Sequence, residues 1–163
     1  MSTTEPTADG DGDDEAEAPR VMLVRVGTER LAVPLAELRE VLRSRPATPV
    51  AGTPPWVRGL VTVRGALVPV ADLFLRAFPA AAEASPWLLV VEREGRQAAL
   101  GVSSVEGVHP VLEPIEVAEL AGTLPRSGAV RLQTQGSGAA VGVPEAVDVL
   151  DVGALFEELF EGD

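Results

Sequence analysis

Residues 59–73 read GLVTVRGALVPVADL and contain two short apolar runs on either side of Arg64-Gly65. Glycine tolerates positive φ, so Arg64-Gly65 fits a tight turn between two adjacent strands. Pro69 has no backbone N–H, which places the second strand at a sheet edge or a bulge. Asp72 is suited to cap a short helix over Leu73–Phe78. The stretch therefore predicts a β-hairpin followed by a short helix.

The residues before this hairpin predict two strands and a short helix. Val21–Val26 and Arg30–Val33 are rich in β-forming residues and are joined by a turn at 27–29. Pro34 then opens a segment with helical spacing, in which Leu35, Leu38, Val41 and Leu42 share one face. The prolines in 44–55 predict an extended connector that leads into the hairpin.

A second block repeats this order of elements after residue 86. Trp87–Glu92 and Arg96–Val102 predict strands joined by a turn at 93–95, and 103–106 has the capping-box spacing of one helical turn. An offset of 66 residues aligns five identical residue pairs in the two blocks, a match that either an internal duplication or chance explains. The paired residues are Leu23 and Leu89, Val24 and Val90, Arg30 and Arg96, Ala32 and Ala98, and Glu40 and Glu106.

The last part of the chain predicts two more strands and a C-terminal helix. Strands are expected at Ala129–Thr134 and Ala146–Leu150, and Asp151 is placed to cap a helix over Val152–Phe160. The glycine-rich residues 135–142 lie between the strands. Their spacing does not match a dinucleotide-binding loop, so a flexible hairpin loop is the better interpretation.

The net charge of −12 is concentrated at the two ends of the chain. Residues 1–19 hold seven acidic residues and no basic one, which predicts a disordered acidic tail, and residues 157–163 hold four more acids. Residues 20–156 are nearly neutral, with 14 acidic residues against 13 arginines. This distribution argues against a nucleic-acid partner. No segment is long and apolar enough to insert into a membrane, and we expect a cytoplasmic protein.

The residue types that are missing exclude several kinds of catalytic site. The chain has no cysteine and no lysine, and His109 is the sole histidine. Thiol chemistry, lysine Schiff bases and histidine-rich metal sites are therefore excluded, and we expect no cofactor. A small hydrolase or ligand-binding protein using His109 with Ser103 or Ser104 stays open as an alternative, although no acidic residue is placed to orient the histidine ring.

The hairpin motif and its surroundings resemble the CheW family of chemotaxis coupling proteins. Residues 59–65 match that family's G-hydrophobic-x-x-x-R-G turn, and residues 67–73 match its hydrophobic-V-P-V-x-D-L strand. The resemblance extends over about residues 20–160. It implies a mainly β fold of two small five-stranded SH3-like barrels packed together, with short helices and a C-terminal helix. We place the two pseudo-repeated barrels at roughly 20–80 and 87–150.

The resemblance also implies a non-catalytic role and a set of contact residues. Members of this family link the cytoplasmic tips of chemoreceptors to the regulatory domain of the histidine kinase CheA. Taken alone, Arg64 and Glu40 fit ordinary solvent-facing charges. By position, however, Arg64 corresponds to the family's receptor-facing arginine and Glu40 to its helical acid, a candidate ion-pair partner of Arg64, while Gly65 holds the turn. Leu38, Val102 and Val105 correspond to apolar partner contacts. A scaffold of the same fold in a pathway without chemoreceptors is a further alternative.

Overall fold

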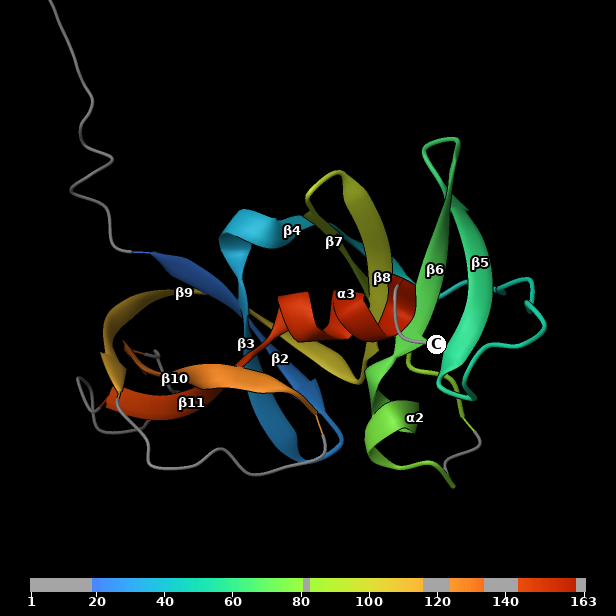
Figure 1. Cartoon of the computed structure of the whole chain (residues 1–163). Coiled ribbons are helices and arrows are strands. Elements are labelled where there is room, and N and C mark those ends of the chain that lie inside the picture. Colours follow the sequence, from blue (N-terminus) through green and yellow to red (C-terminus); the bar gives the residue numbers. More distant parts are fainter. Residues whose placement is uncertain (1–18, 81–82, 116–123, 134–143, 161–163) are drawn as a thin grey trace, which may run out of the picture.

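The computed structural model describes residues 19–80, 83–115, 124–133 and 144–160, which form two five-stranded sheets side by side with short helices (Figure 1). The mainly β fold is therefore confirmed. The predicted acidic tail and the glycine-rich loop lie outside the described residues, apart from Pro19. The elements, in chain order, are β2 (Arg20–Val26), β3 (Glu29–Pro34), η1 (Leu35–Glu37), β4 (Leu38–Arg43), β5 (Val57–Val63), β6 (Ala66–Asp72), α2 (Leu73–Ala77), β7 (Trp87–Arg93), β8 (Arg96–Val102), β9 (Ser104–Ile115), β10 (Arg126–Gln133), β11 (Pro144–Leu150) and α3 (Val152–Phe160).

One sheet closes into a barrel and the other stays open. The barrel has the strand order β10-β11-β3-β2-β9, and the second sheet has the order β4-β7-β8-β6-β5. Both expected five-stranded units are therefore present, and only the first closes completely through strand pairing. In the second sheet, the edge strand β4 ends at Arg43, before the prolines of the connector, and does not pair with β5. Only the connector that follows β4 reaches β5, through an isolated bridge between Thr48 and Leu60. In the barrel, by contrast, the long strand β9 pairs with both β2 and β10.

The two sheets do not correspond to the predicted halves 20–80 and 87–150. The barrel combines β2 and β3 with β9, β10 and β11, whereas the second sheet is built from β4 to β8. The chain crosses from barrel to sheet at η1 and returns at Ser103. The strand that follows the β2–β3 hairpin and the strand that follows the β7–β8 hairpin each join the other sheet, because β4 pairs with β7 and β9 pairs with β2.

The segment 35–42 was expected to be helical, and it is a short 3-10 turn followed by strand β4. A bulge in β4 explains why the helical spacing misled, because Leu38 pairs with Val91 while Glu40 pairs with Val90. The extra residue Arg39 lets Leu38 and Val41, three positions apart, both face the central core. The expected helical turn at 103–106 is likewise the bulged start of β9.

The β2–β3 and β7–β8 hairpins are equivalent at an offset of 67 residues rather than 66. The last cross-strand pairs before the two turns are Val26 with Glu29 and Arg93 with Arg96. At this offset Val24 matches Val91, and both lie in the central core. A shift of one residue turns every side chain to the opposite face, so the identities found at offset 66 do not join equivalent positions.

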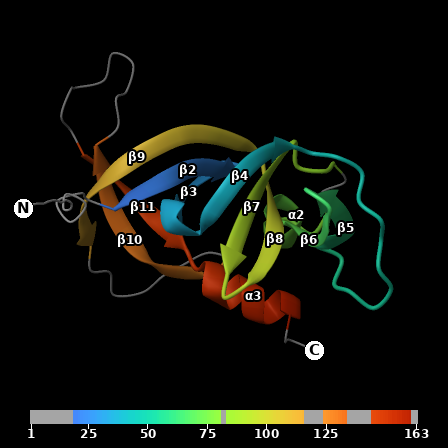
Figure 2. The same cartoon turned by 90° about the horizontal axis from the view of Figure 1, so that it is seen from above.

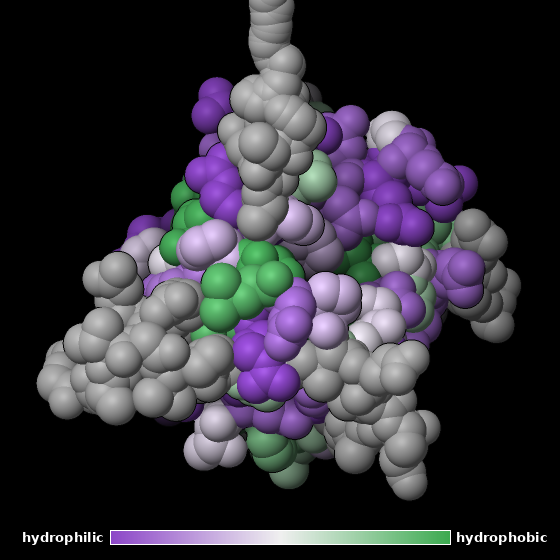
Figure 3. Space-filling view, turned by 90° about the vertical axis from the view of Figure 1, so that its left-hand side faces the viewer, coloured by the Kyte–Doolittle hydropathy of each residue, from purple (hydrophilic) through white to green (hydrophobic). Residues whose placement is uncertain are grey.

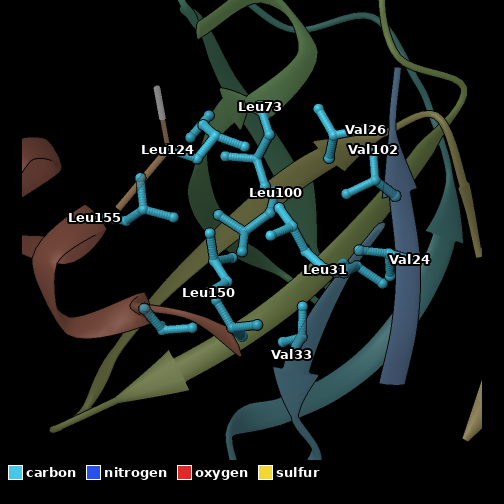
Figure 4. Packing of buried hydrophobic residues seen from close by; sticks show 14 of the residues in the cluster. Val24, Val26, Leu31, Val33, Leu73, Leu100, Val102, Leu124, Leu150 and Leu155 are labelled. Atoms are coloured by element: carbon cyan, nitrogen blue, oxygen red, sulfur yellow. The ribbon is translucent and has the colours of Figure 1, made fainter. Parts of the chain in front are cut away.

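Three apolar clusters hold the fold together. One fills the barrel, one lines the inner face of the second sheet, and the largest lies between the sheets (Figure 4). Both helices add to this central cluster through Leu73 of α2 and Leu155 of α3. Asp72 and Asp151 cap the two helices by accepting backbone N–H groups of Leu75 and Ala154, as predicted. Figure 2 shows α3 along one side of the junction between the sheets.

Candidate partner-binding site

Arg64 and Glu40 form a two-pronged ion pair at the surface. The Nε–H of Arg64 donates to Oε2 of Glu40 at 2.9 Å, and its Nη2–H donates to Oε1 at 3.1 Å. The Arg64 side chain is 79% exposed and that of Glu40 is 20% exposed. The hydrogen bonds and the charge of Glu40 raise the pKa of the Arg64 guanidinium above its ordinary value. The arginine therefore stands at the surface in a fixed direction.

This ion pair links the two open edges of the second sheet. Glu40 lies on β4 and Arg64 lies in the β5–β6 turn, and β4 and β5 are the first and last strands of the sheet. The bulge at Arg39 places Glu40 on the same side of β4 as Leu42, which packs against the apolar cluster on the inner face of the second sheet. The predicted pair therefore exists, and it spans the gap that keeps the second sheet from closing.

The turn that carries Arg64 has the backbone of a tight hairpin. Arg64 has a φ of 51° and Gly65 a φ of 84°, two positive values as in a type I′ turn. The β7–β8 turn repeats this geometry at Glu94 and Gly95. Glycine suits the second position because a side chain there would be strained although space is open. The predicted structural place of Gly65 is thus the tip of the hairpin.

The predicted apolar contacts Leu38, Val102 and Val105 differ in exposure. Leu38 and Val105 are half-buried and pack against the central cluster from β4 and β9. They occupy equivalent places, because Leu38 pairs with Val91 and Val105 pairs with Val24. Val102 has no exposed surface and belongs to the core. The structure therefore leaves Leu38 and Val105 accessible and removes Val102 from the surface.

Arg64 and Val102 lie at opposite ends of the second sheet. Arg64 precedes β6, whereas Val102 follows Gly101, the residue that pairs with Asp72 at the end of β6. Six residues along a strand separate these ends by roughly 20 Å. The buried Val102 is therefore far from the Arg64–Glu40 ion pair, whereas Leu38 lies on the same strand as Glu40, on the side that faces the junction of the sheets.

Exposed apolar side chains gather at both ends of the molecule. On the barrel, Val108 and Leu112 project from β9, and Figure 3 shows an apolar patch among hydrophilic residues on this face. On the second sheet, Leu67 of the β5–β6 hairpin is 68% exposed. A cavity of about 340 Å³ adjoins this hairpin and is lined by residues that include Val50, Leu60, Pro69 and Phe160. Sequence reasoning missed both surfaces, because outward-facing apolar residues in a strand look like core residues.

The structure does not bring the alternative catalytic residues together. His109 and Ser104 lie on the same strand, five residues or roughly 16 Å apart, and pair with Val21 and Arg25. The Ser103 hydroxyl accepts the N–H of Gly27 at 2.9 Å. Among the described residues, the His109 side chain has no hydrogen bond or ion pair, and no group of three potential metal ligands occurs. No helix in the described part of the chain is long and apolar enough to cross a membrane.

The family is shown by comparison with known proteins. The model of the CheW-like domain matches residues 20–160. The chain is 30% identical over 88 residues to the chemotaxis protein CheW of Rhizobium meliloti strain 1021, a match that covers 54% of this chain and 56% of that relative. The aligned stretch thus spans about half the length of the relative.

A solved structure supports the same fold. The scaffolding protein TtCheW of Thermoanaerobacter tengcongensis superimposes with a TM-score of 0.67 over 90% of this chain and 96% of that chain, at 20% sequence identity. The chain belongs to the CheW-like domain family.

Proposed function

We propose that this protein is a non-catalytic cytoplasmic adaptor that couples chemoreceptor tips to the regulatory domain of a CheA-type histidine kinase. The observation that carries the proposal is the presence of separate exposed surfaces on one compact fold. Apolar side chains project from β9 at one end and from the β5–β6 hairpin at the other, and Arg64 lies in the turn of this hairpin. Exposed apolar patches of this kind are typical of protein-binding surfaces.

Arg64 is the residue we assign to the receptor contact. It is already oriented by Glu40, so its outward N–H groups lose little freedom on binding. Leu38 and Val105 supply half-buried apolar area at the junction of the sheets. The two end surfaces, with Leu112 and Leu67, are assigned to the kinase, whose regulatory domain has the same fold by family resemblance. The affinity of each single contact is modest, and an array of many such contacts supplies the overall affinity.

The proposal is tested by co-sedimentation with receptor signalling fragments and with the CheA regulatory domain of the same organism. We expect binding to both at tens of micromolar or below. We also expect Arg64→Ala to fold and to lose receptor binding more than kinase binding, and Leu67→Asp to show the reverse pattern. If the protein binds neither the receptor fragment nor the kinase domain, the proposal is contradicted. Binding to the kinase domain alone favours a scaffold of the same fold that serves a pathway without chemoreceptors.

A further inference from the structure

Arg43 and Trp87 form a stacked pair at the end of the two paired strands β4 and β7. Their Cα atoms are cross-strand partners, and the guanidinium carbon of Arg43 lies 4.7 Å from the centre of the Trp87 ring. Trp87 is half-buried against the central cluster, whereas Arg43 is exposed. The cation is therefore held on a ring that is itself anchored in the core.

The pair lies on the opposite side of β4 from the Arg64–Glu40 ion pair. Beyond the bulge, Val41 faces the central cluster and Leu42 faces the interior of the second sheet. Alternation along the strand places Arg43 with Val41 and Glu40 with Leu42. Together, Leu38, Val41 and the Arg43–Trp87 stack make one surface, which we call the β4 patch. It offers apolar area and one positive charge.

Arg43 has no carboxylate partner among the described residues. Most arginines of the described structure form ion pairs, and Arg43 is not among them. Arg45, two residues further along, also has no carboxylate partner there and donates from Nη1 to the carbonyl of Thr62 at 3.2 Å. The end of β4 therefore carries two exposed arginines that form no ion pair with another described residue.

The guanidinium N–H groups of Arg43 donate to no acceptor in the described part of the chain. A guanidinium that stacks on an aromatic ring uses its face, while its N–H donors point outward in the plane. These donors match the two oxygens of a carboxylate. Because the ring restrains the side chain, binding costs less conformational entropy than it would for a free arginine. Arginine and tryptophan are also the residues most often found at energetic centres of interfaces.

We propose that Arg43, held on Trp87, determines partner specificity by binding an Asp or Glu side chain of the receptor tip, while apolar residues next to that acid lie on Leu38 and Val41. This inference rests on the proposed function, because the receptor tip is the partner it names. The choice of partner follows from charge, since the patch pairs apolar area with an unneutralised cation. An acidic residue beside apolar ones in the partner satisfies both.

The test compares the unaltered protein with Arg43→Ala and Arg39→Ala in titrations with the receptor signalling fragment. Arg39 is a matched control because it lies on the same strand and is exposed, but its Nε–H is already paired with Glu92 at 3.0 Å. We expect about a tenfold weaker affinity for Arg43→Ala, the typical effect of losing a hydrogen bond to a charged group. Arg39→Ala should bind within about twofold of the unaltered protein.

Further variants distinguish the planar arrangement of the Arg43 N–H donors from the positive charge of this residue. Arg43→Lys keeps the positive charge but not the planar fork, so it should recover only part of the affinity. Arg43→Glu should abolish binding, and reversal of the contacted acid in the receptor to arginine should restore it. Circular dichroism and urea unfolding of each variant check that the fold is retained.

The outcomes separate the two proposals. Lack of receptor binding by the unaltered protein overturns the proposed function and this inference together. Receptor binding that is unchanged in Arg43→Ala overturns the inference and leaves the proposed function standing. Equal losses in Arg43→Ala and Arg39→Ala also overturn it, because they indicate a general charge effect rather than a specific contact.

Discussion

Arg39 and Glu106 occupy equivalent bulge positions in the two halves of the molecule and carry opposite charges. Each is the extra residue at the start of the strand that crosses to the other sheet. The Nε–H of Arg39 donates to Glu92 at 3.0 Å, and Glu106 accepts from Arg25 at 3.0 Å. Glu92 and Arg25 are themselves equivalent, so the same contact is made in both halves with the charges exchanged.

Replacement of Glu106 should cost more stability than replacement of Glu92. Glu106 also accepts from Arg30 at 3.1 Å, and Arg25 and Arg30 are direct cross-strand neighbours. Glu106→Gln leaves these two like charges facing each other, so we expect a loss of about 1 kcal/mol. Glu92→Gln removes one exposed ion pair and should cost less than about 0.5 kcal/mol. Urea unfolding midpoints measure both, and equal losses would contradict the two-partner role of Glu106.

Asp72 is the most heavily bonded acid in the described structure, and its removal should be strongly destabilising. It is 2% exposed and accepts from Arg58 Nε at 2.9 Å, the Ser85 hydroxyl at 2.6 Å and two backbone N–H groups. Asp72→Ala should cost about 3 kcal/mol, because it leaves buried donors unpaired. Asp151→Ala, which removes only a helix cap, serves as the control with an expected loss of about 1 kcal/mol.

Asp72 should also make stability depend on pH in the acid range. Burial by itself raises the pKa of Asp72, but hydrogen bonds from Ser85, Leu75 and Arg58 outweigh it and lower the pKa below the ordinary 3.8. A depressed pKa in the folded state means that the stabilisation is complete above the unfolded-state pKa and is lost as the pH falls through the folded-state value. The stability difference between the unaltered protein and Asp72→Asn should therefore be constant above about pH 5 and shrink below about pH 4. A constant difference down to pH 3 would contradict this assignment.

Glycine substitutions should separate backbone strain from steric conflict. Gly65 and Gly95 have positive φ and open space around them, so alanine at either should cost about 1 kcal/mol. At Gly59, by contrast, a Cβ would lie 2.1 Å from the Thr48 carbonyl oxygen. That carbonyl accepts the N–H of Leu60 and ties the connector to β5. Gly59→Ala should therefore lose more than about 3 kcal/mol by thermal unfolding, and a loss equal to that of Gly65→Ala would contradict the close approach.

Local features were predictable where one short segment decides them. The hairpin around Arg64-Gly65 and both aspartate-capped helices were correctly predicted, because turn and cap chemistry depend on neighbouring residues. The helix expected at 35–42 failed because a bulge at Arg39 imitates helical spacing. The exchange of β4 and β9 between sheets depends on pairing with strands far away in the sequence, which periodicity does not reveal.

The candidate site was predictable to a similar extent. The family resemblance offered Glu40 as a candidate ion-pair partner of Arg64, and the structure contains this pair. Val102 was placed at a partner surface, but its strand lies in the core. The Arg43–Trp87 stack escaped sequence reasoning because its members are 44 positions apart and are joined only by strand pairing. Alignment of the two hairpin turns, at 27–28 and 94–95, would have revealed the correct repeat register.

The crossed strands have a mechanical consequence. The chain passes between the sheets at η1 and at Ser103, and neither passage contains slack. Separating the two sheets would strain these short passages and the pairing of β4 with β7 and of β9 with β2, so we expect the junction to resist bending. We therefore expect the distance between the β9 end and the β5–β6 end to change little. Partners held at these two ends would be spaced by a ruler of fixed length, and a displacement of one would be transmitted directly to the other.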